Sequence, residues 1–464
     1  MAFHDLLHFP AVMPPVPSLA ETSPLVRSLL SDLGLEPGTV DLAIDPEDEM
    51  LGFLVRSCGG DHERALYAYF QSGASVAGAM AQVLAWRFGE PGRVGRLLDF
   101  ASGYGRVTRF LLRLLPPERV WVADVYTAGV SFQQRRFGVH GMVSTVRPED
   151  FAAAAGAGTF DAILVTSLFT HLPEERFVAW LRVLMGLLAP GGVLAFSVHD
   201  RCLLQAGEVL PPAGLLFREI SESGSLAGED YGSTWVSEDF VRGALRQALA
   251  GTGDAVAAAS LHRLARGLCH FQDLYVAVPE AGADFSHLAF RGEPYLFVER
   301  CALTGPDRLE LRGWAAELGH GNLAAVEVFL DRQLLARLPI DGSRPEVAAM
   351  LGDPRLGRSG WGGACRLPEG ASRSTSMLRL RVVDDRGTGH PEAAATLEAA
   401  LHDSTKLEVT VLHRELRQAA EHAARLAGET AALAARIAAM EASRFWKLRN
   451  QWFRVKGWLG MGER

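Results

Sequence analysis

The stretch LLDFASGYGRVTRFLL, residues 97–112, indicates the fold of the first two thirds of this chain. An apolar run ends at Asp99 and Phe100, a short turn of small residues follows, and apolar residues at helical spacing begin directly after it. A strand, a tight turn and a helix in this order place the turn at the carboxyl edge of a parallel sheet, where α/β proteins bind ligands. The stretch therefore predicts a ligand-binding turn.

Short apolar runs alternate with helical patterns on both sides of this turn. The expected strands are GRLLDF, RVWVADV, GMVSTV, FDAILVTSLF, GGVLAFSV and DLYVAV, the last ending near Pro279. Strands that alternate with helices imply right-handed crossovers and a mostly parallel sheet with both faces covered. We expect this α/β domain at 93–280, after a helical N-terminal cap at 1–92.

The pattern changes after a linker at 280–293. Apolar residues then alternate with a period of two between Gly, Pro and Asp turns, which predicts a small antiparallel β-sandwich at 296–386. A heptad seam with steps of three and four predicts a coiled coil at 407–442. The seam consists of Val409, Leu412, Leu416, Ala419, Ala423, Leu426, Thr430, Leu433, Ile437 and Met440. Its alanines and its threonine predict weaker association than a Leu/Ile zipper would give.

The last segment, 443–464, combines aromatic and basic side chains on one expected amphipathic helix. Its apolar residues recur at steps of three and four: Phe445, Leu448, Trp452, Val455 and Leu459. Its interleaved basic residues are Arg444, Lys447, Arg449, Arg454 and Lys456. This composition suits an anionic membrane surface, and packing on a partner protein or on the oligomer itself is the alternative.

Composition bounds the class of protein. With 464 residues, 48% hydrophobic and 22% charged, the chain is typical of a soluble globular protein of two or three domains. A net charge of -8 argues against a nucleic-acid partner. The five cysteines form no Cys-x-x-Cys pair, which fits a reducing cytoplasm and predicts no metal site. The N-terminus lacks a basic signal-peptide region, and no run of about 18 uncharged apolar residues occurs, so we expect a cytoplasmic protein.

The turn could in principle hold a phosphate, a dinucleotide or a ligand without phosphate. A P-loop needs Gly-Lys-Ser/Thr after the turn, and residues 97–112 contain no lysine. A dinucleotide fingerprint needs Gly or Ala where this chain has Thr108. The carboxylate of Asp99 would repel a pyrophosphate, whereas it can attract an ammonium or a sulfonium. The charge of Asp99 therefore favours a cationic ligand.

The segment DFASGYG resembles motif I (D/E-x-G-x-G-x-G) of the class I S-adenosylmethionine-dependent methyltransferases. Three further segments match the family in order: VWVADV, FDAILVTSLFTHLPEE and LRVLMGLLAPGGVLAFSVHD. The resemblance covers about Gly92 to Pro279 and implies a Rossmann-like sheet with S-adenosyl-L-methionine as cofactor. One departure is Ala101, which stands where the family usually has its first Gly.

The resemblance also implies a set of cofactor contacts. These residues are Asp99, Ala101, Ser102, Gly103, Tyr104, Gly105, Asp124 and Ser167. In the family an acidic side chain at the position of Asp124 holds both ribose hydroxyls, and two carboxylate oxygens suit a vicinal diol. The plainer alternatives are a helix N-cap for Asp124, surface packing for Tyr104 and a generic βα turn for the glycines.

Methyl transfer is an in-line displacement at an already activated methyl group, so the protein mainly positions two reactants and excludes water. It requires no metal. If the acceptor is a hydroxyl, a histidine of ordinary pKa suits the role of general base, and the candidates are His171 and His199. The alternative for His171 is a hydrogen bond that shapes the loop before the helix at Pro173.

The C-terminal third suggests the partners. Its β module resembles one attached to bacterial cell-surface-polysaccharide enzymes, notably glycosyltransferases, and its tail resembles one that follows coiled coils in the same class. This implies a sugar hydroxyl of a surface glycan, or of its lipid-linked precursor, as acceptor. The alternatives are a small metabolite or protein acceptor, or a non-catalytic oligomeric scaffold for polysaccharide enzymes. We expect a homo-oligomer through the coiled coil and, through the tail, contact with the inner face of the membrane or with a glycosyltransferase.

Overall fold

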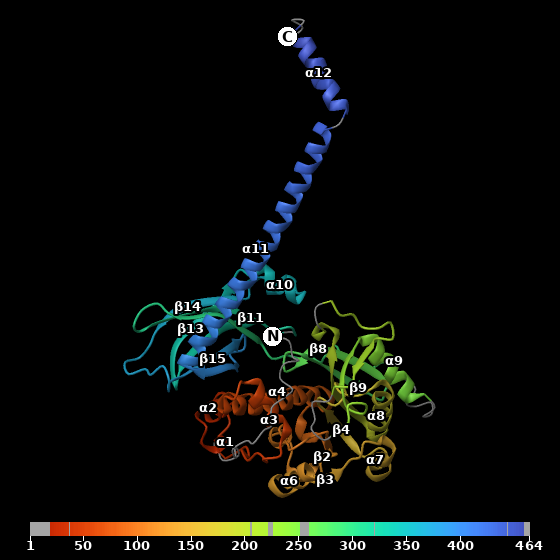
Figure 1. Ribbon diagram of the computed structural model, residues 1–464. Helices are drawn as coiled ribbons and strands as arrows, with labels where there is room; N and C mark the ends of the chain where they lie inside the picture. Colours follow the sequence, from red (N-terminus) through yellow and green to blue (C-terminus); the bar gives the residue numbers. More distant parts are fainter. Residues whose placement is uncertain are drawn as a thin grey trace. The chain divides into compact units, whose positions relative to one another are not determined.

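The structure, a computed structural model, describes residues 19–36, 38–204, 207–220, 226–250, 259–319, 321–442 and 444–458. The chain divides into two compact units, Met1–Ala400 and Leu401–Arg464 (Figure 1). Residues 1–18 of the predicted cap and Leu459 of the predicted tail lie outside the described residues.

The first unit begins with helices. They are α1 (Leu19–Thr22), α2 (Pro24–Asp32), α3 (Glu49–Ser57) and α4 (His62–Phe88). The long helix α4 starts where the Asp61 side chain accepts a hydrogen bond from the backbone N–H of Arg64. It ends at Gly89, whose φ of 83° stops the helix at low steric cost. Through its buried face, α4 joins the core of the α/β domain.

A nine-stranded sheet follows, and it confirms the predicted Rossmann-like α/β fold. Its strands are β1 (Leu97–Phe100), β2 (Val120–Asp124), β3 (His140–Val143), β4 (Phe160–Val165), β5 (Leu188–Asp200), β6 (Leu215–Arg218), β7 (Ser233–Val236), β8 (Ser260–Leu268) and β9 (Gln272–Val278). The order is β3-β2-β1-β4-β5, with all neighbours parallel. Beyond β5 the sheet is mixed: β7 pairs parallel to the end of β5, and β9 pairs antiparallel to it.

Helices cover both faces of this sheet. They are α5 (Thr108–Leu111), α6 (Thr127–Phe137), α7 (Pro148–Ala155), α8 (Glu174–Leu187) and α9 (Glu238–Leu249). Side chains alternate along a strand, so Leu97 packs into the core shared with α4 while Leu98 packs into the core shared with α8 and α9. Both faces are therefore apolar, and ligand access is left to the strand ends.

The second half of the first unit is an antiparallel sheet. Its strands are β10 (Tyr295–Leu303), β11 (Arg308–Ala316), β12 (Leu323–Leu330), β13 (Gln333–Gly342), β14 (Gly360–Arg366), β15 (Met377–Asp384) and β16 (Gly389–Thr396), with α10 (Pro345–Leu351) after β13. The antiparallel character agrees with the prediction. The strands do not form the two separate sheets of the predicted sandwich. Strand β13 pairs with both β12 and β14, so all seven strands form one hydrogen-bonded sheet.

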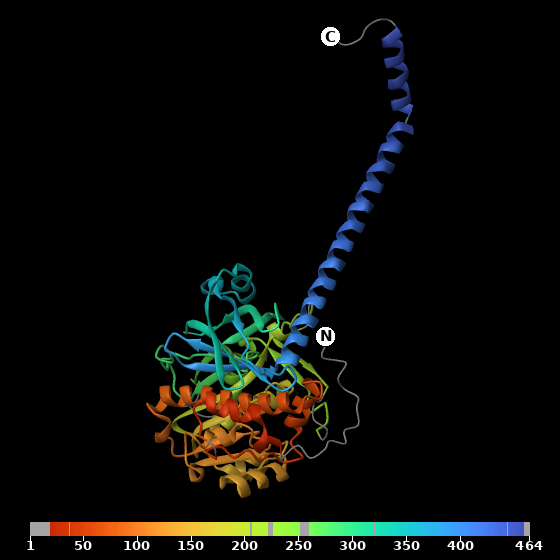
Figure 2. The ribbon, with the colours of Figure 1, turned by 90° about the vertical axis from the view of Figure 1, so that its left-hand side faces the viewer.

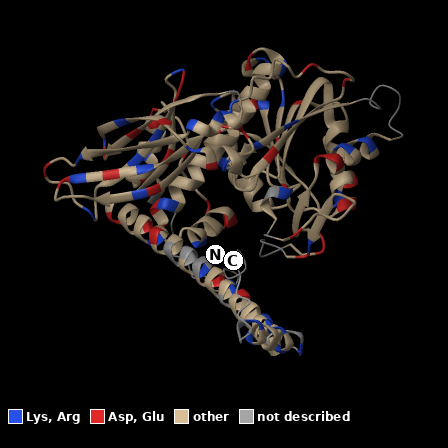
Figure 3. Cartoon of the chain, turned by 90° about the horizontal axis from the view of Figure 1, so that it is seen from above, with Lys and Arg blue, Asp and Glu red and all other residues tan. Residues whose placement is uncertain are grey.

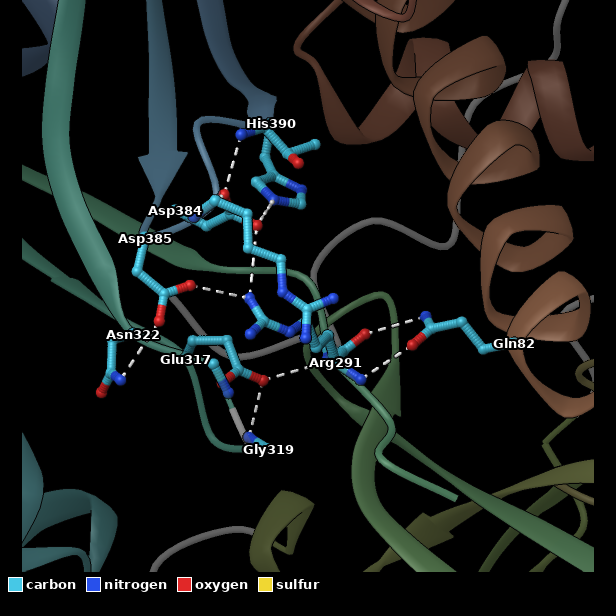
Figure 4. Close-up of polar contacts among 12 residues, drawn as sticks. Gln82, Arg291, Glu317, Gly319, Asn322, Asp384, Asp385 and His390 are labelled. Atoms are coloured by element: carbon cyan, nitrogen blue, oxygen red, sulfur yellow. Dashed lines mark hydrogen bonds and ion pairs between the residues drawn. The ribbon is translucent and has the colours of Figure 1, made fainter. Parts of the chain in front are cut away.

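The segment predicted to be a linker, 280–293, is held against both of its neighbours (Figure 4). The side-chain amide of Gln82 on α4 donates to the carbonyl of Arg291 at 3.0 Å and accepts from its N–H at 2.8 Å. The Arg291 guanidinium lies 3.4 Å from the carboxylate of Asp384, the last residue of β15, and 3.0 Å from that of Asp385, which follows the strand. Apolar Leu288 and Phe290 are buried in the core that α4 lines. This segment is therefore a packed junction.

The second unit consists of helices (Figure 2). Helix α11 (Leu397–Ala442) begins in the first unit, and α12 (Arg444–Trp458) follows it. The predicted coiled-coil segment is helical throughout. Pairing with a second helix stays a prediction. Among the described helices, none is both long and apolar enough to cross a membrane.

Candidate functional site

A cavity of about 240 Å³ opens at the carboxyl edge of the parallel sheet. Its walls come from the turn after β1, the ends of β2 and β4, the segment after β3, the first turn of α8 and the loop before β7. Residues of the N-terminal helical cap also line it: Asp48, Glu49, Met50 and Phe53. The predicted cofactor residues all line this cavity except Gly105, which lies directly behind the turn.

The turn after β1 depends on left-handed backbone. Ala101, Gly103 and Gly105 have φ values of 58°, 55° and 82°. A Cβ on Gly105 would lie 2.5 Å from the Phe137 ring, whereas a Cβ on Gly103 would meet no atom within 4 Å, so the cavity wall is open at Gly103. The turn extends past Gly105, because α5 begins only at Thr108.

Asp99 is a buried carboxylate at the base of this turn. Its side chain is fully buried, and Oδ2 accepts a hydrogen bond from the Thr108 hydroxyl at 2.7 Å. Its Oδ1 is buried and has no hydrogen-bond partner in the part of the chain that the structure describes. Burial raises the pKa of Asp99 to about 7. A buried acceptor beside a cavity invites a hydrogen-bond donor, and an ammonium would also favour the ionised carboxylate.

Asp124 ends β2 and ties the turn to its neighbouring strand. Its Oδ2 accepts from the backbone N–H of Gly103 at 2.7 Å, and its Oδ1 accepts from that of Tyr126 at 3.0 Å. Burial raises the pKa of Asp124, although these backbone N–H groups oppose the rise. Helix α6 begins at Thr127 with Tyr126 as its N-cap, so Asp124 lies two residues before the cap position. Asp124 also lines the cavity, where the two oxygens of a carboxylate suit a vicinal diol.

A strap from the helical cap, residues 45–50, closes one side of the cavity. The Tyr104 hydroxyl donates to Glu47 at 3.3 Å, and the Tyr126 hydroxyl donates to Glu49 at 3.2 Å. The sequence-based interpretation missed this strap, because no local pattern indicates that a segment about fifty residues before the turn returns to it. The acidic run DPEDEM was the only local signal.

Arg109 connects the turn with the strap. It is the largest fully buried side chain of the described residues, and its Nε donates to the Gly105 carbonyl at 3.0 Å. Its Nη1 donates to the carbonyls of Asp41 and Ala43 at 2.9 and 3.0 Å. The hydroxyl of Tyr69, beside this guanidinium, donates to Asp48 at 2.6 Å. The buried cation therefore fixes the cap segment relative to the glycine turn.

His171 lies on the opposite wall and lines the cavity. Its Nδ1 is 2.7 Å from the carbonyl oxygen of Gly232, and its ring stacks on Tyr231 with centroids 4.4 Å apart. A carbonyl only accepts, so Nδ1 carries the proton and Nε2 carries the lone pair of the neutral ring. The hydrogen bond thus fits both interpretations of His171, because it shapes the loop and also sets the tautomer that a general base needs.

The second candidate base, His199, is placed differently. It does not line the cavity, and burial lowers its pKa to about 3. Its ring lies 6.3 Å from that of His171, centroid to centroid. A histidine of this pKa takes up a proton poorly near neutral pH, so the geometry favours His171 over His199.

Ser102 and Ser167 lie at the cavity wall with engaged side chains. The Ser102 hydroxyl accepts from the Gln133 amide at 2.9 Å. Ser167 has a φ of 60°, and its hydroxyl accepts from the Gln272 amide at 3.0 Å. Both hydroxyls are thus already hydrogen-bonded within the chain. At the rim, Arg176 pairs with Asp230 at 3.0 Å and donates to the Val146 carbonyl at 2.7 Å.

Comparisons with known proteins agree with this geometry. Residues 98–194 match the family model described as a methyltransferase domain. A curated relative, the malonyl-[acyl-carrier protein] O-methyltransferase of Prosthecochloris aestuarii, is 27% identical over 146 residues, which is 32% of this chain. The match covers 54% of that relative, so it spans about half of its length.

Solved methyltransferase structures also match in part. A SAM-dependent methyltransferase of Leishmania major is 15% identical, with 50% of this chain and 84% of that one covered and a TM-score of 0.32. A 1,6-didemethyltoxoflavin-N1-methyltransferase of Burkholderia thailandensis, solved with S-adenosylhomocysteine, is 18% identical, with 52% and 93% covered and a TM-score of 0.32. The family match assigns residues 98–194 to a methyltransferase domain, and S-adenosyl-L-methionine is the cofactor expected there.

The residues of the cavity fit that cofactor. The unpartnered Oδ1 of Asp99 suits the ammonium of its methionine part, and Asp124 suits the ribose diol. Gly103 leaves room at the turn between them. Within the described ranges, no cluster of His, Cys, Asp or Glu is arranged to hold a metal ion.

Proposed function

We propose that this protein transfers the methyl group of S-adenosyl-L-methionine to a hydroxyl oxygen of an acceptor bound in the same cavity. The observation that carries the proposal is Asp99, a fully buried carboxylate with one oxygen unpartnered among the described residues, at the wall that Asp124 shares. A carboxylate kept in this state is costly unless a bound cation compensates it.

The cofactor supplies a methyl group activated by its sulfonium. The cavity residues hold both reactants in line and exclude water, as the buried walls formed by Tyr104, Leu172 and Trp180 permit. His171 presents Nε2 as a base: it takes the acceptor's hydroxyl proton while the new carbon–oxygen bond forms and the methyl–sulfur bond breaks. The neutral thioether S-adenosylhomocysteine is the leaving group.

We also propose a sugar hydroxyl of a surface glycan, or of its lipid-linked precursor, as the acceptor. The support is the antiparallel module at 295–396, whose sequence resembles modules of polysaccharide enzymes, and its packed junction with the methyltransferase domain. The name of the curated relative, an O-methyltransferase, supports oxygen as the accepting atom. A malonyl thioester, a small metabolite or a protein are the competing acceptors.

Calorimetry tests the cofactor part of the proposal. The purified chain is titrated with S-adenosylmethionine and S-adenosylhomocysteine, and Asp124→Ala is expected to weaken both by about 100-fold, since charge-assisted hydrogen bonds are lost. Glu149→Ala, an exposed residue outside the cavity, is the matched control. If neither compound binds the wild-type chain, the proposed activity is wrong and the alternative, a non-catalytic scaffold, is supported.

Mass spectrometry tests the acceptor. Surface glycan from a strain lacking the protein is expected to lose the mass of one CH2 group per modified sugar. Unchanged glycan together with intact cofactor binding would reject the glycan acceptor and leave the methyl transfer standing. A metabolite or protein substrate would then be sought with radiolabelled methyl donor.

We propose further that α11 joins copies of the chain in the cytoplasm. Its seam side chains Leu416, Leu433 and Ile437 are 66%, 59% and 57% exposed, as expected of a helix that lacks its partner helix. The described cysteines Cys58, Cys269 and Cys365 are free thiols, which fits a reducing compartment. Light scattering of the full chain beside Leu433→Glu/Ile437→Glu is the test, and an unchanged mass would reject association through α11.

A further inference from the structure

Helix α12 (Arg444–Trp458) is a basic helix without a negative charge. Its charged residues are Arg444, Lys447, Arg449, Arg454 and Lys456, and the segment contains no Asp or Glu (Figure 3, Lys and Arg in blue). The whole chain carries a net charge of -8. The positive charge of α12 is thus a local feature that opposes the charge of the rest of the protein.

An apolar stripe runs along the same helix. Leu448, Trp452 and Val455 are spaced by four and three residues, which places them on one face at about 3.6 residues per turn. They are 70%, 64% and 48% exposed. Side chains of this size, exposed in a row, mark a surface that is covered by something other than water.

The cations lie along both edges of this stripe. At about 100° per residue, Lys447 and Arg454 fall on one side of it, and Arg449 and Lys456 fall on the other. A flat anionic surface can meet both edges at once, whereas an acidic protein groove would need two separate acidic walls at this spacing. The arrangement therefore favours a surface that is negatively charged in every direction.

Aromatic contacts hold one of these edge cations in place. The Arg449 guanidinium lies 4.5 Å from the ring centroid of Trp446 and 5.1 Å from that of Phe453. At about 100° per residue, Trp446 and Phe453 lie on the face opposite Leu448, so these contacts position Arg449 at the edge and do not extend the stripe. Long basic side chains can bury their carbon stems in the boundary between water and acyl chains while their charges reach the phosphates.

We propose that α12 binds the surface of a membrane rich in anionic lipids. Leu448, Trp452 and Val455 enter the acyl boundary, and the flanking lysines and arginines contact the headgroup phosphates. The helix lies along the surface, in keeping with its 15 residues and its five charges. This binding is independent of methyl transfer, and it would hold the catalytic domain near membrane-borne acceptors.

Vesicle sedimentation of the full chain tests the proposal. The wild-type protein is expected to pellet with vesicles of phosphatidylcholine and phosphatidylglycerol, to stay in solution with phosphatidylcholine alone, and to be released by salt. Lys447→Glu/Arg454→Glu should lower the partition coefficient more than tenfold, and Trp452→Ser should lower it at unchanged charge.

The matched control is Arg417→Glu/Arg436→Glu, which makes the same change of charge at exposed positions of α11. It should bind vesicles nearly as the wild-type chain does. Calorimetry with S-adenosylhomocysteine on all variants shows that the first unit stays folded. Equal binding to neutral vesicles, no pelleting at all, or equal losses in the control would overturn the proposal, as would α12-dependent capture by an acidic protein in its place.

Discussion

Two groups of buried carboxylates in this protein share one physical problem and solve it differently. At the cavity, burial raises the pKa of Asp99 to about 7, and its Oδ1 has no partner among the described residues. At the junction of α4, β9 and β16, burial raises the pKa of Glu293 to about 6 and that of Glu392 well above its ordinary value. Asp99 borders the cavity, whereas Glu293 and Glu392 lie at a contact between elements of the chain.

The junction group is enclosed by other parts of the chain. His270 Nε2 lies 3.8 Å from Glu293 and 3.7 Å from Glu392, and the side chain of Glu392 is 4% exposed. Burial lowers the pKa of His270 to about 4, so this imidazole is neutral near neutral pH, while the raised pKa of Glu392 favours its protonated form. The comparison teaches that a buried carboxylate indicates a ligand where it borders a cavity, and a structural group with a raised pKa where the chain covers it.

The largest expected effect tests His171, the proposed general base. His171→Gln removes the base but can keep a donor toward the Gly232 carbonyl, so kcat should fall about 100-fold or more while the Kd of S-adenosylmethionine changes little. The measurement is initial rate against cofactor concentration with the identified acceptor. His199→Gln, outside the cavity, is the comparison variant, and a loss as large as that of His171→Gln would contradict the assignment.

A second prediction tests whether Glu293, at the junction, affects the stability of the protein and not cofactor binding. Because Glu293 holds its proton more tightly when folded, its stability cost is absent below pH 4.5 and complete above about pH 6. Glu293→Gln should therefore raise the free energy of unfolding by about 2 kcal/mol at pH 8. The gain should vanish near pH 4.

The measurement for Glu293→Gln is denaturant unfolding at both pH values, followed by calorimetry with S-adenosylhomocysteine. Cofactor affinity should stay unchanged, since Glu293 does not line the cavity. A change in affinity equal to that of a cavity variant would break the distinction between the two groups.

The smallest expected effect concerns Asp99, where loss of the charge should weaken cofactor binding and stabilise the cofactor-free protein. Asp99→Asn keeps the hydrogen bond with Thr108 but loses the charge, so cofactor binding should weaken about tenfold, as for one charge-assisted hydrogen bond. The same variant without cofactor should be more stable than wild type above pH 7, because the raised pKa makes ionised Asp99 costly there. Weaker binding with no gain in stability would show that Asp99 is already compensated.

Much of the fold and half of the site follow from local sequence. The strand at 97–100, the small-residue turn and Asp124 at the next strand end were predictable, because apolar periodicity and turn residues act over a few positions. The packing of 280–293 was not, since polar linker composition does not show that Gln82 and Asp384 converge on Arg291. The strap at 45–50 was not predicted either, because its own composition does not show that it returns to the turn.

By itself, the sequence determined strands β1 to β5 and β9 with the helices between them, the turn after β1 and the charge of the carboxylates around it. Only the tertiary structure decided which of two histidines faces the cavity, why Arg109 is buried between turn and strap, and which buried carboxylates are left for a ligand. The physical reason is the range of the interactions, because backbone conformation is set by residues that are close along the chain. Burial, and with it the pKa and partner of a charged group, is set by residues that only folding brings together.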